Sequence, residues 1–474
     1  MLGGYAADVA DGALPGDVTV LKEGPSTGHD EGQAMAELIH QVAPDAQIYF
    51  YTAFDGETDF ANGIAALTAT GCQEIVDDVT YLDEPFFQDG GVVQTAVENA
   101  VAHGGELFHR RQQRRKQFPA TRLRRHFHHA TRHFRRVPRR EFRLGRQTEY
   151  AGKPDHRQRQ HGDDRPAMGD QPFASIGTGN ASANSLGMVL YDDTGKIVAY
   201  AMANDTGGNP DQILQFTNTT GSTDFHLAIV TNGGAVAPGQ FKFIVYGTGT
   251  TINDRNAGIG SGTIICHEMV AGANTVGAID YGATPAFGGS NTVEGFSSVG
   301  DGGLLFDAEG NRLPGGSGGA SVDFVAPDGS ATSVFNPFYG TSAAASNAAA
   351  VAALVLQADP ALTPAEVTAI LADTADPVRG AQGATGAGLI DATAAVRLAT
   401  ATAVNGDAAA LVAATAQNPV TASIAASLLN AVGASMSLAS LATTGAASFF
   451  ATLADPTGAL GLAEVASGSA GSVP

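Results

Sequence analysis

The chain has 474 residues, a formal net charge of −21 at pH 7 and 43% hydrophobic residues, which is the profile of a globular protein with two or three domains rather than of a disordered chain. The acidic balance, with a pI near 4.8, argues against a general nucleic-acid binder. The two cysteines, Cys72 and Cys266, can form one bridge at most, which excludes a disulfide framework.

The first residues show no targeting signal. Residues 1–5 lack the basic and then apolar regions of a secretory signal peptide. Further along, the apolar runs are rich in alanine and interrupted by Thr, Ser and Asn, so none reaches the roughly 18 strongly apolar residues of a membrane helix. We therefore expect no membrane span.

Residues 1–104 alternate between strand and helix patterns. Runs of apolar and β-branched residues predict strands, and apolar residues at helical spacing predict helices between them. The expected strands are 18–21, 47–52 and 74–79, and the expected helices are 32–42, 60–70 and 92–102. Such alternation indicates a parallel sheet whose strands are connected by crossover helices.

The composition changes abruptly in residues 105–170. Most of the chain's 26 lysines and arginines fall in this Arg/His-rich block, and neither helical nor strand periodicity continues through it. We interpret the block as non-native sequence from a frame-shifted stretch of the gene, because regular patterns resume after it. The alternatives are phosphate or nucleic-acid binding by its arginines, or metal binding by His126, His128 and His129.

Short β patterns follow in residues 171–255, separated by turns rich in Gly, Asn and Asp. The expected strands are 186–191, 197–202, 211–217, 225–230 and 240–246. Several short strands at this spacing predict an inserted β-sandwich.

The α/β pattern returns in residues 256–400 and ends in two helices. One helix is expected from residue 343 to 357, and the other begins near Pro364, where Thr363 and Glu366 form a capping box. Residues 401–474 are rich in Ala, Ser, Gly and Thr and nearly uncharged, which predicts weak helices or a linker-like tail without chemistry.

Ser342 stands in the run Gly-Thr-Ser, immediately before the long apolar helix. A serine in such a place is most often an N-cap, because its hydroxyl satisfies free helix N–H groups. The surroundings are more specific, with ordered apolar and glycine-containing segments at 322–329, 338–339 and 386–392. The positive end of a helix dipole favours a nucleophile there, and the serine's own N–H can stabilise an oxyanion.

The series of segments in residues 262–398 resembles the C-terminal half of the subtilase family of serine proteases, in which a buried helix begins at the nucleophilic serine. The resemblance implies a three-layer α/β domain with a parallel sheet, made from residues 1–104 and 256–400. It also implies peptide-bond hydrolysis in a protein or peptide substrate, with Ser342 forming an acyl-enzyme. Ser346 and Asn347 replace the family's Pro and His shortly after the nucleophile.

A nucleophilic serine needs a base, and the candidate lies in residues 28–48. This segment is similar to the subtilase histidine motif, but Glu31 occupies the histidine's place before a glycine, as in the sedolisin (serine-carboxyl) branch. A carboxylate can take the serine proton when burial or a like-charged neighbour favours its protonated form, and Asp30 and Glu37 are such neighbours. The predicted catalytic residues are Ser342, Glu31 and Asp30. The alternative is that these acids merely favour a helix N-terminus.

The chain departs from the family pattern around this base. Met35 stands where sedolisins carry a second acid, and His29 and His40 lie outside the motif position. The family's catalytic Asp and its strand are not found before the motif, where the available acids are Asp8, Asp11 and Asp17.

After the helix at 92–102, the apolar strand that leads to the family's oxyanion Asn is also not expected, because the Arg/His-rich block begins there. We expect Asp77 and Asp78 to be structural or cleft acids, and His267 to be a packing or turn residue rather than a base.

The residues identify no cofactor, although the resemblance admits a bound calcium ion. It also implies a secreted or cell-envelope protein, and the oligomeric state is not indicated. The alternative function is a catalytically inactive subtilase relative that binds protein or glycan. A nucleic-acid binder would depend on the Arg/His-rich block alone, so no nucleic-acid partner is expected.

Overall fold

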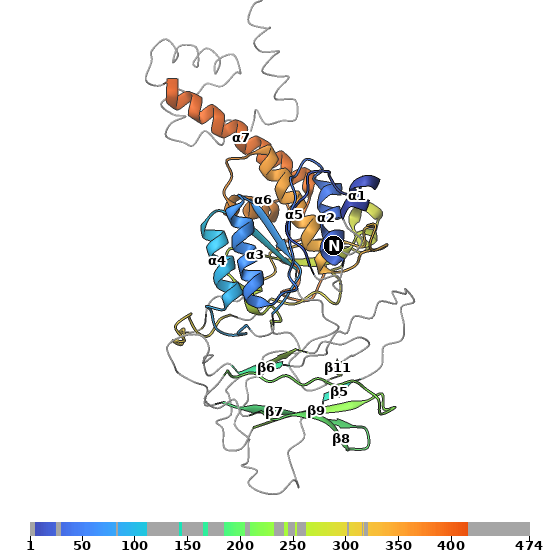
Figure 1. Ribbon diagram of the computed structural model, residues 1–474. Coiled ribbons are helices and arrows are strands. Elements are labelled where there is room, and N and C mark those ends of the chain that lie inside the picture. The colour runs from blue at the N-terminus through green and yellow to red at the C-terminus, as the bar shows by residue number, and fades with distance from the viewer. Residues whose placement is uncertain are drawn as a thin grey trace, which may run out of the picture. The chain divides into compact units, whose positions relative to one another are not determined.

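The structure is a computed structural model that describes residues 5–24, 30–81, 84–110, 142–144, 165–168, 184–203, 209–231, 241–244, 252–253, 262–300, 303–314, 316 and 321–415 (Figure 1). The chain divides into two compact units. One comprises residues 1–350 and 375–389, and the other comprises residues 351–374 and 390–474. His29, the three histidines at 126, 128 and 129, and the tail after residue 415 lie outside the described residues.

The N-terminal part alternates between helices and strands as predicted, and each expected element is present with ends that differ by a few residues. The order is α1 (Tyr5–Asp11), β1 (Thr19–Lys22), α2 (Glu31–Val42), β2 (Tyr49–Tyr51), α3 (Glu57–Ala69), β3 (Glu74–Asp77), α4 (Val92–Ala102) and β4 (Glu106–Arg110). Crossover helices between consecutive strands are what a parallel sheet requires.

Four parallel strands form the central sheet. Their order is β13-β12-β4-β3, with β12 spanning Asn274–Asp280 and β13 spanning Phe324–Asp328. Strands β1 and β2 form a separate parallel pair. The predicted α/β class with a parallel sheet is therefore confirmed.

Strand β4 corrects the sequence analysis, which expected no apolar strand after α4. Leu107 and Phe108 are both 0% exposed, and β4 pairs with β3 on one side and β12 on the other. The prediction failed because it depended on composition. Two apolar residues, Leu107 and Phe108, are enough for a short strand when β3 and β12 satisfy its backbone groups on both sides. The assignment of residues 105–170 to non-native sequence stays a prediction.

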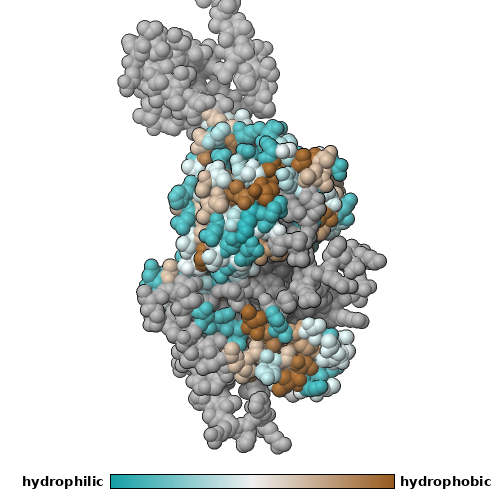
Figure 2. All heavy atoms as spheres, viewed as in Figure 1, coloured by the Kyte–Doolittle hydropathy of each residue, from teal (hydrophilic) through white to brown (hydrophobic). Residues whose placement is uncertain are grey.

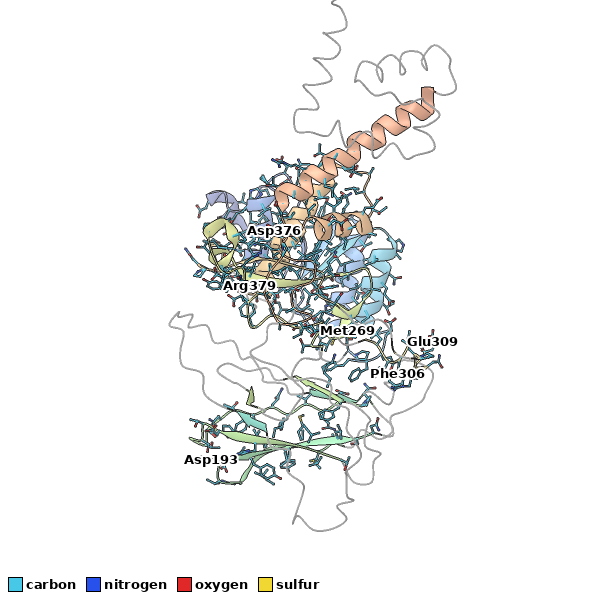
Figure 3. All side chains as sticks on the ribbon, turned by 180° about the vertical axis from the view of Figure 1, so that it is seen from behind. Asp193, Met269, Phe306, Glu309, Asp376 and Arg379 are labelled. Atoms are coloured by element: carbon cyan, nitrogen blue, oxygen red, sulfur yellow. The ribbon has the colours of Figure 1, made fainter. Side chains whose placement is uncertain are left out.

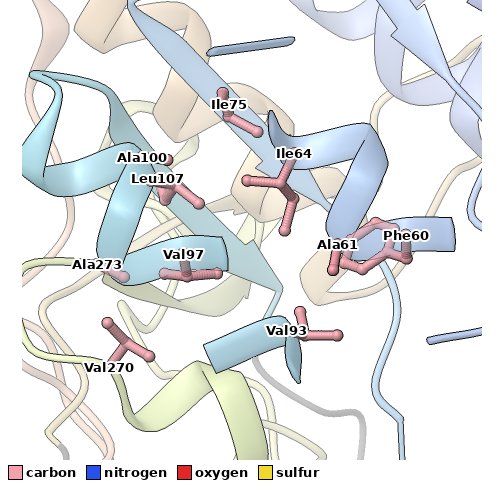
Figure 4. Close-up of a cluster of buried hydrophobic side chains, with 10 residues drawn as sticks. All are labelled: Phe60, Ala61, Ile64, Ile75, Val93, Val97, Ala100, Leu107, Val270 and Ala273. Carbon is pink, nitrogen blue, oxygen red and sulfur yellow. The ribbon is translucent and has the colours of Figure 1, made fainter. Parts of the chain in front are cut away.

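Helices cover both faces of the sheet. On one face α3 and α4 enclose a core with β3 and β4 (Figure 4), formed by Phe60, Ala61, Ile64, Ile75, Val93, Val97, Ala100, Leu107, Val270 and Ala273. On the other face α2 and α5 (Thr341–Ala358) meet around Leu38, Phe338 and Ala343, with Val76 packed against them. Ile75 and Val76 serve opposite faces because side chains alternate along a strand. The result is the expected three-layer order.

An antiparallel sheet of different character lies between β4 and β12 in the sequence. Its strand order is β11-β5-β9-β7-β8, with β5 at Phe142–Leu144, β7 at Leu186–Asp192, β8 at Ile197–Ala201, β9 at Phe225–Thr231 and β11 at Ile252–Asn253. Strands β6 (Arg165–Met168) and β10 (Phe241–Ile244) form a separate antiparallel pair. In the β7–β8 turn, Asp193 accepts a hydrogen bond from Ser222 (Figure 3).

The expected strand at 211–217 is wrong, since these residues make only isolated bridges. The side chain of Gln212 explains the difference. Its amide donates to the carbonyl of Ala203 at 2.8 Å and its oxygen lies 3.3 Å from the Ala203 nitrogen, which replaces a backbone ladder. Among the described residues the insertion is one five-stranded sheet and one strand pair, so a two-sheet sandwich stays a prediction.

Short 3-10 helices complete the region after the insertion, and two longer helices end the described chain. The short ones are η1 (Cys266–Met269), η2 (Tyr281–Ala283) and η3 (Pro285–Phe287), and the longer ones are α6 (Pro364–Asp373) and α7 (Ala392–Thr415). The capping box is confirmed, because the carboxylate of Glu366 accepts hydrogen bonds from both the backbone and the hydroxyl of Thr363. Cys72 and Cys266 do not form a disulfide bond.

Within the described part of the chain, α5 is the one helix with the length and hydropathy of a membrane span, and 72% of it is buried. Burial of this extent is typical of the core helix of a globular domain. On the face in Figure 2, hydrophilic and hydrophobic residues are interspersed.

Candidate active site

Ser342 is the second residue of α5 and is 0% exposed. The turn before it depends on Gly340, whose φ of 135° is disfavoured for residues with a side chain. The N–H of Gly340 donates to Asp328 Oδ2 at 2.8 Å, and Asp328 is the last residue of β13. The end of β13, an outer strand of the four-stranded sheet, thus holds the turn that starts the serine helix.

The hydroxyl of Ser342 contacts two carboxyl groups. Its Oγ lies 2.9 Å from Glu31 Oε1 and 2.6 Å from Asp78 Oδ1. A serine hydroxyl has one proton, so it can donate to only one of these oxygens at a time. The group is therefore a serine hydroxyl placed between two carboxyl groups.

Three elements that pack together position this group. Glu31 is the first residue of α2, Ser342 lies in the first turn of α5, and these two helices pack on the same face of the sheet. Asp78 directly follows β3, two residues after Val76, so it points to that same face. Both helix N-termini meet the carboxyl end of a parallel strand, which is where α/β proteins most often bind ligands.

Asp77 points to the opposite face and makes a different set of contacts. Its Oδ2 lies 2.5 Å from His109 Nδ1 and 3.6 Å from His267 Nε2. On its other side His267 contacts Glu84, with Nδ1 at 3.3 Å from Oε2. These four side chains are almost completely buried.

Burial alone would raise the pKa of Asp77, but the charges of His109 and His267 outweigh it and hold this pKa below its usual range. For His267, burial acts to lower the pKa, whereas its contacts with Asp77 and Glu84 raise it to about 10. Asp77 and His267 are therefore electrostatically coupled buried groups on the face of β3 opposite to Asp78.

A pocket of about 210 Å³ adjoins the serine group. Glu31 and Asp78 contribute polar groups to its wall, and the rest is largely apolar and aromatic, including Phe50, Phe54 and Phe60. The pocket is lined from both β2 and β3, which belong to separate sheets. Carboxyls beside an apolar hollow are a typical arrangement for binding and orienting a substrate side chain.

The other candidate bases lie around α2. Asp30 is the N-cap residue of α2 and lines the same pocket as Glu31, and its catalytic role stays a prediction. Glu37 is buried and accepts hydrogen bonds from the N–H and hydroxyl of Ser333, each at 2.6 Å. Met35 belongs to the core between α2 and α5, and His40 lies in the last turn of α2.

Residues that depart from the family pattern have structural partners. The hydroxyl of Ser346 donates to the carbonyl of Ser342 at 2.9 Å, and the Asn347 amide donates to the carbonyl of Pro327 at 2.9 Å. Asp8 is bonded to Gln33 of α2 and accepts from the Ser333 hydroxyl at 3.2 Å. The replacements thus join α5 to its own first turn and to β13.

The structure brings together Ser342 and Glu31, which were predicted to act together, and adds Asp78, which was expected to be a structural or cleft acid and lines the pocket. The available signal was two successive acids at the end of a strand, which must point to opposite faces of the sheet. His267 is, as expected, a turn residue, because it belongs to η1.

Comparison with known proteins identifies the family. Residues 169–389 match the model of the subtilase family, and no curated protein matches the chain. This region contains Ser342 and ends before α7. Similar solved structures include a lanthipeptide protease, which is 12% identical with a TM-score of 0.36 and 82% of this chain and 85% of that chain covered.

Two further solved structures are similar. A protease from Pseudoalteromonas arctica is 14% identical, with a TM-score of 0.29 and coverage of 76% of this chain and 64% of that chain. MycP1 from the ESX-1 type VII secretion system is 14% identical, with a TM-score of 0.33 and coverage of 81% of each chain. The family match at 169–389, just under half of the chain, carries the assignment: this part of the chain is similar to the subtilase family.

Proposed function

We propose that this chain is a serine endopeptidase of the serine-carboxyl kind, with Ser342 as nucleophile and Glu31 as the base that accepts its proton. The observation that carries the proposal is the contact of the Ser342 hydroxyl with Glu31 at 2.9 Å and Asp78 at 2.6 Å. A base must lie within hydrogen-bond reach of the proton that it removes, and both carboxyls meet this requirement.

In the proposed reaction Ser342 Oγ attacks the carbonyl carbon of the substrate while its proton passes to Glu31. The oxyanion that forms can be stabilised by the backbone N–H of Ser342, which lies at the positive end of the α5 dipole. The proton held by the two carboxyls then passes to the departing amine, and water hydrolyses the acyl-enzyme by the same steps in reverse order.

Met35 stands where sedolisins carry a second acid, and Asp78 is our candidate for this role. Because it contacts the same hydroxyl as Glu31, it offers a second acceptor for the serine proton. Asp30 lies on the same pocket wall. The apolar and aromatic lining of the pocket suits an apolar substrate side chain.

Access to the nucleophile constrains the proposal. Ser342 is 0% exposed, whereas the pocket reaches the two carboxyls that hold its hydroxyl. A substrate must therefore approach from the pocket and displace at least one of these carboxyls from Oγ. Small electrophiles should react more readily than bulky ones.

A fluorophosphonate probe tests the nucleophile directly. We expect covalent labelling of the full chain, with loss of labelling and at least a roughly 1,000-fold loss of peptidase activity in Ser342→Ala. Ser346→Ala is the matched control, because it removes a buried hydroxyl from the same helix one turn later. Labelling that persists in Ser342→Ala, or a folded chain that no small fluorophosphonate labels, would overturn the proposal.

A further inference from the structure

Asp77, His109 and His267 form a compact group of potential metal ligands that the proposed hydrolysis does not use. One donor atom from each lies within 4.8 Å of the others, and all three side chains are buried. The His109 and His267 rings meet edge to face, with centroids 5.1 Å apart. The group is thus small enough for all three side chains to reach one ion.

Donor atoms in this group lack partners. His109 Nε2, His267 Nε2 and Asp77 Oδ1 are buried atoms without a hydrogen bond. Buried polar groups are nearly always satisfied, because each unsatisfied one costs about 1–3 kcal/mol. His267 Nε2, which lies 3.6 Å from Asp77 Oδ2, and Asp77 Oδ1 therefore point to a missing common partner, and His109 faces the same carboxylate through Nδ1.

Glu84 gives His267 the support that metal-binding histidines usually have. Its Oε2 contacts His267 Nδ1 and accepts the His267 backbone N–H at 3.0 Å. Its Oε1 accepts from the N–H groups of Val93 and Gln94 at 2.8 and 3.0 Å, which fixes the carboxylate on α4. A histidine whose Nδ1 is bound by a carboxylate presents Nε2 to a metal.

Charge and donor chemistry select the ion. Asp77 and Glu84 bring two carboxylates into a closed space, and a divalent cation would neutralise them. Two imidazoles and one carboxylate suit first-row transition metals, whereas calcium prefers oxygen ligands alone. Bonds of about 2 Å to a tetrahedral zinc ion would place the donors roughly 3.3 Å apart, so a modest contraction is needed.

We propose that Asp77, His109 and His267 bind one divalent transition-metal ion, with Zn²⁺ as the preferred occupant, and that Glu84 orients His267. The three ligands come from β3, β4 and η1, so the ion joins segments that are distant in sequence. Met269, which ends η1, shows the position of this segment in Figure 3. The ion would fix the strand end that presents Asp78 to Ser342.

The test uses the full chain and needs no peptidase activity. After treatment with a chelator and dialysis, we expect Zn²⁺ to bind in a 1:1 ratio and to raise the melting temperature by about 5 °C at saturation. Co²⁺ in its place should show the visible absorption of a four- or five-coordinate site. A folded, metal-free chain that neither binds Zn²⁺ nor gives this absorption with Co²⁺ overturns the proposal without any variant.

Two variants and a control assign the ligands. His267→Gln and His109→Gln should each lose the Co²⁺ absorption and the thermal shift, whereas His103→Gln, at an exposed histidine after α4, should keep both. Zinc binding unchanged in both ligand variants would overturn the assignment. Peptide mapping by mass spectrometry of the same preparation checks that residue 109 is histidine, and any other residue there would also overturn it.

Discussion

Asp77 and Asp78 are neighbours in sequence with opposite surroundings. Both acids line the pocket, but Asp78 is half-buried and contacts Ser342, whereas Asp77 is nearly closed off from solvent and contacts two histidines. The difference arises from the alternation of a β-strand, which sends successive side chains to opposite faces. One face thereby receives an acid beside the serine hydroxyl, and the other receives an acid beside two buried imidazoles.

The largest expected effect is on the catalytic rate, after substitution of the two carboxyls that contact Ser342. Glu31→Gln should lower kcat about 1,000-fold, because the amide cannot accept the serine proton, and Asp78→Asn should lower it about 10- to 100-fold. If the carboxyls act as a unit, the double variant should be about as slow as Glu31→Gln alone. Initial rates on an unstructured peptide measure this, with Asp45→Asn, an exposed acid, as control. A larger loss in Asp78→Asn than in Glu31→Gln would reverse the two roles.

The next effect concerns stability on the Asp77 face. Asp77→Asn should lower the free energy of unfolding by about 3 kcal/mol, because it removes the buried carboxylate that two buried histidines contact. Asp78→Asn should change it by less than about 1 kcal/mol, since Asp78 is half-buried beside the pocket. Urea unfolding of the two variants at neutral pH compares them. Equal losses of unfolding free energy in the two variants would contradict the difference in surroundings that we describe for Asp77 and Asp78.

The smallest effect concerns pH. Burial, together with the nearby Glu294 and Asp280, raises the pKa of Asp328 to about 7, despite the opposing hydrogen bond from Gly340. Between about pH 4 and 7 the folded chain holds this proton and the unfolded chain does not. The contribution of Asp328 to stability is therefore greatest below about pH 4 and is lost as pH rises through about 7.

Melting temperatures measured from pH 4 to 8 check this prediction. Asp328→Asn keeps an oxygen that can accept from Gly340 but cannot ionise, so its pH profile should be flatter than that of the unchanged chain. Asp45→Asn provides the comparison for an exposed acid. A profile with the same slope in Asp328→Asn would assign the pH dependence to other groups.

Much of the fold follows from local patterns. Helices α2 and α4 were predicted almost to their ends because their apolar residues recur at helical spacing, and α6 because its capping box is a local signal. The position of Ser342 at the start of α5 was visible for the same reason, since glycine and two hydroxyl residues precede an apolar run. Features of this kind depend on a few consecutive residues.

What could not be predicted depends on residues far apart in sequence. The partner of Asp78 is 264 residues away, and no local pattern links them. Strand β4 is stabilised by neighbours on both sides rather than by its own four or five residues. At 211–217 the side chain of Gln212 takes hydrogen bonds that a strand would have made with its backbone.

At the end of β3, the position of a residue along the strand decides which face of the sheet its side chain reaches. Inserting or deleting one residue in β3 would exchange the acids, so that Asp78 would face the histidines and Asp77 would face Ser342, unless a bulge restored the register. Such a change alters no chemical group, yet it disturbs the serine group and the buried histidines together. The length of this short strand therefore constrains the protein as strictly as the identity of either acid.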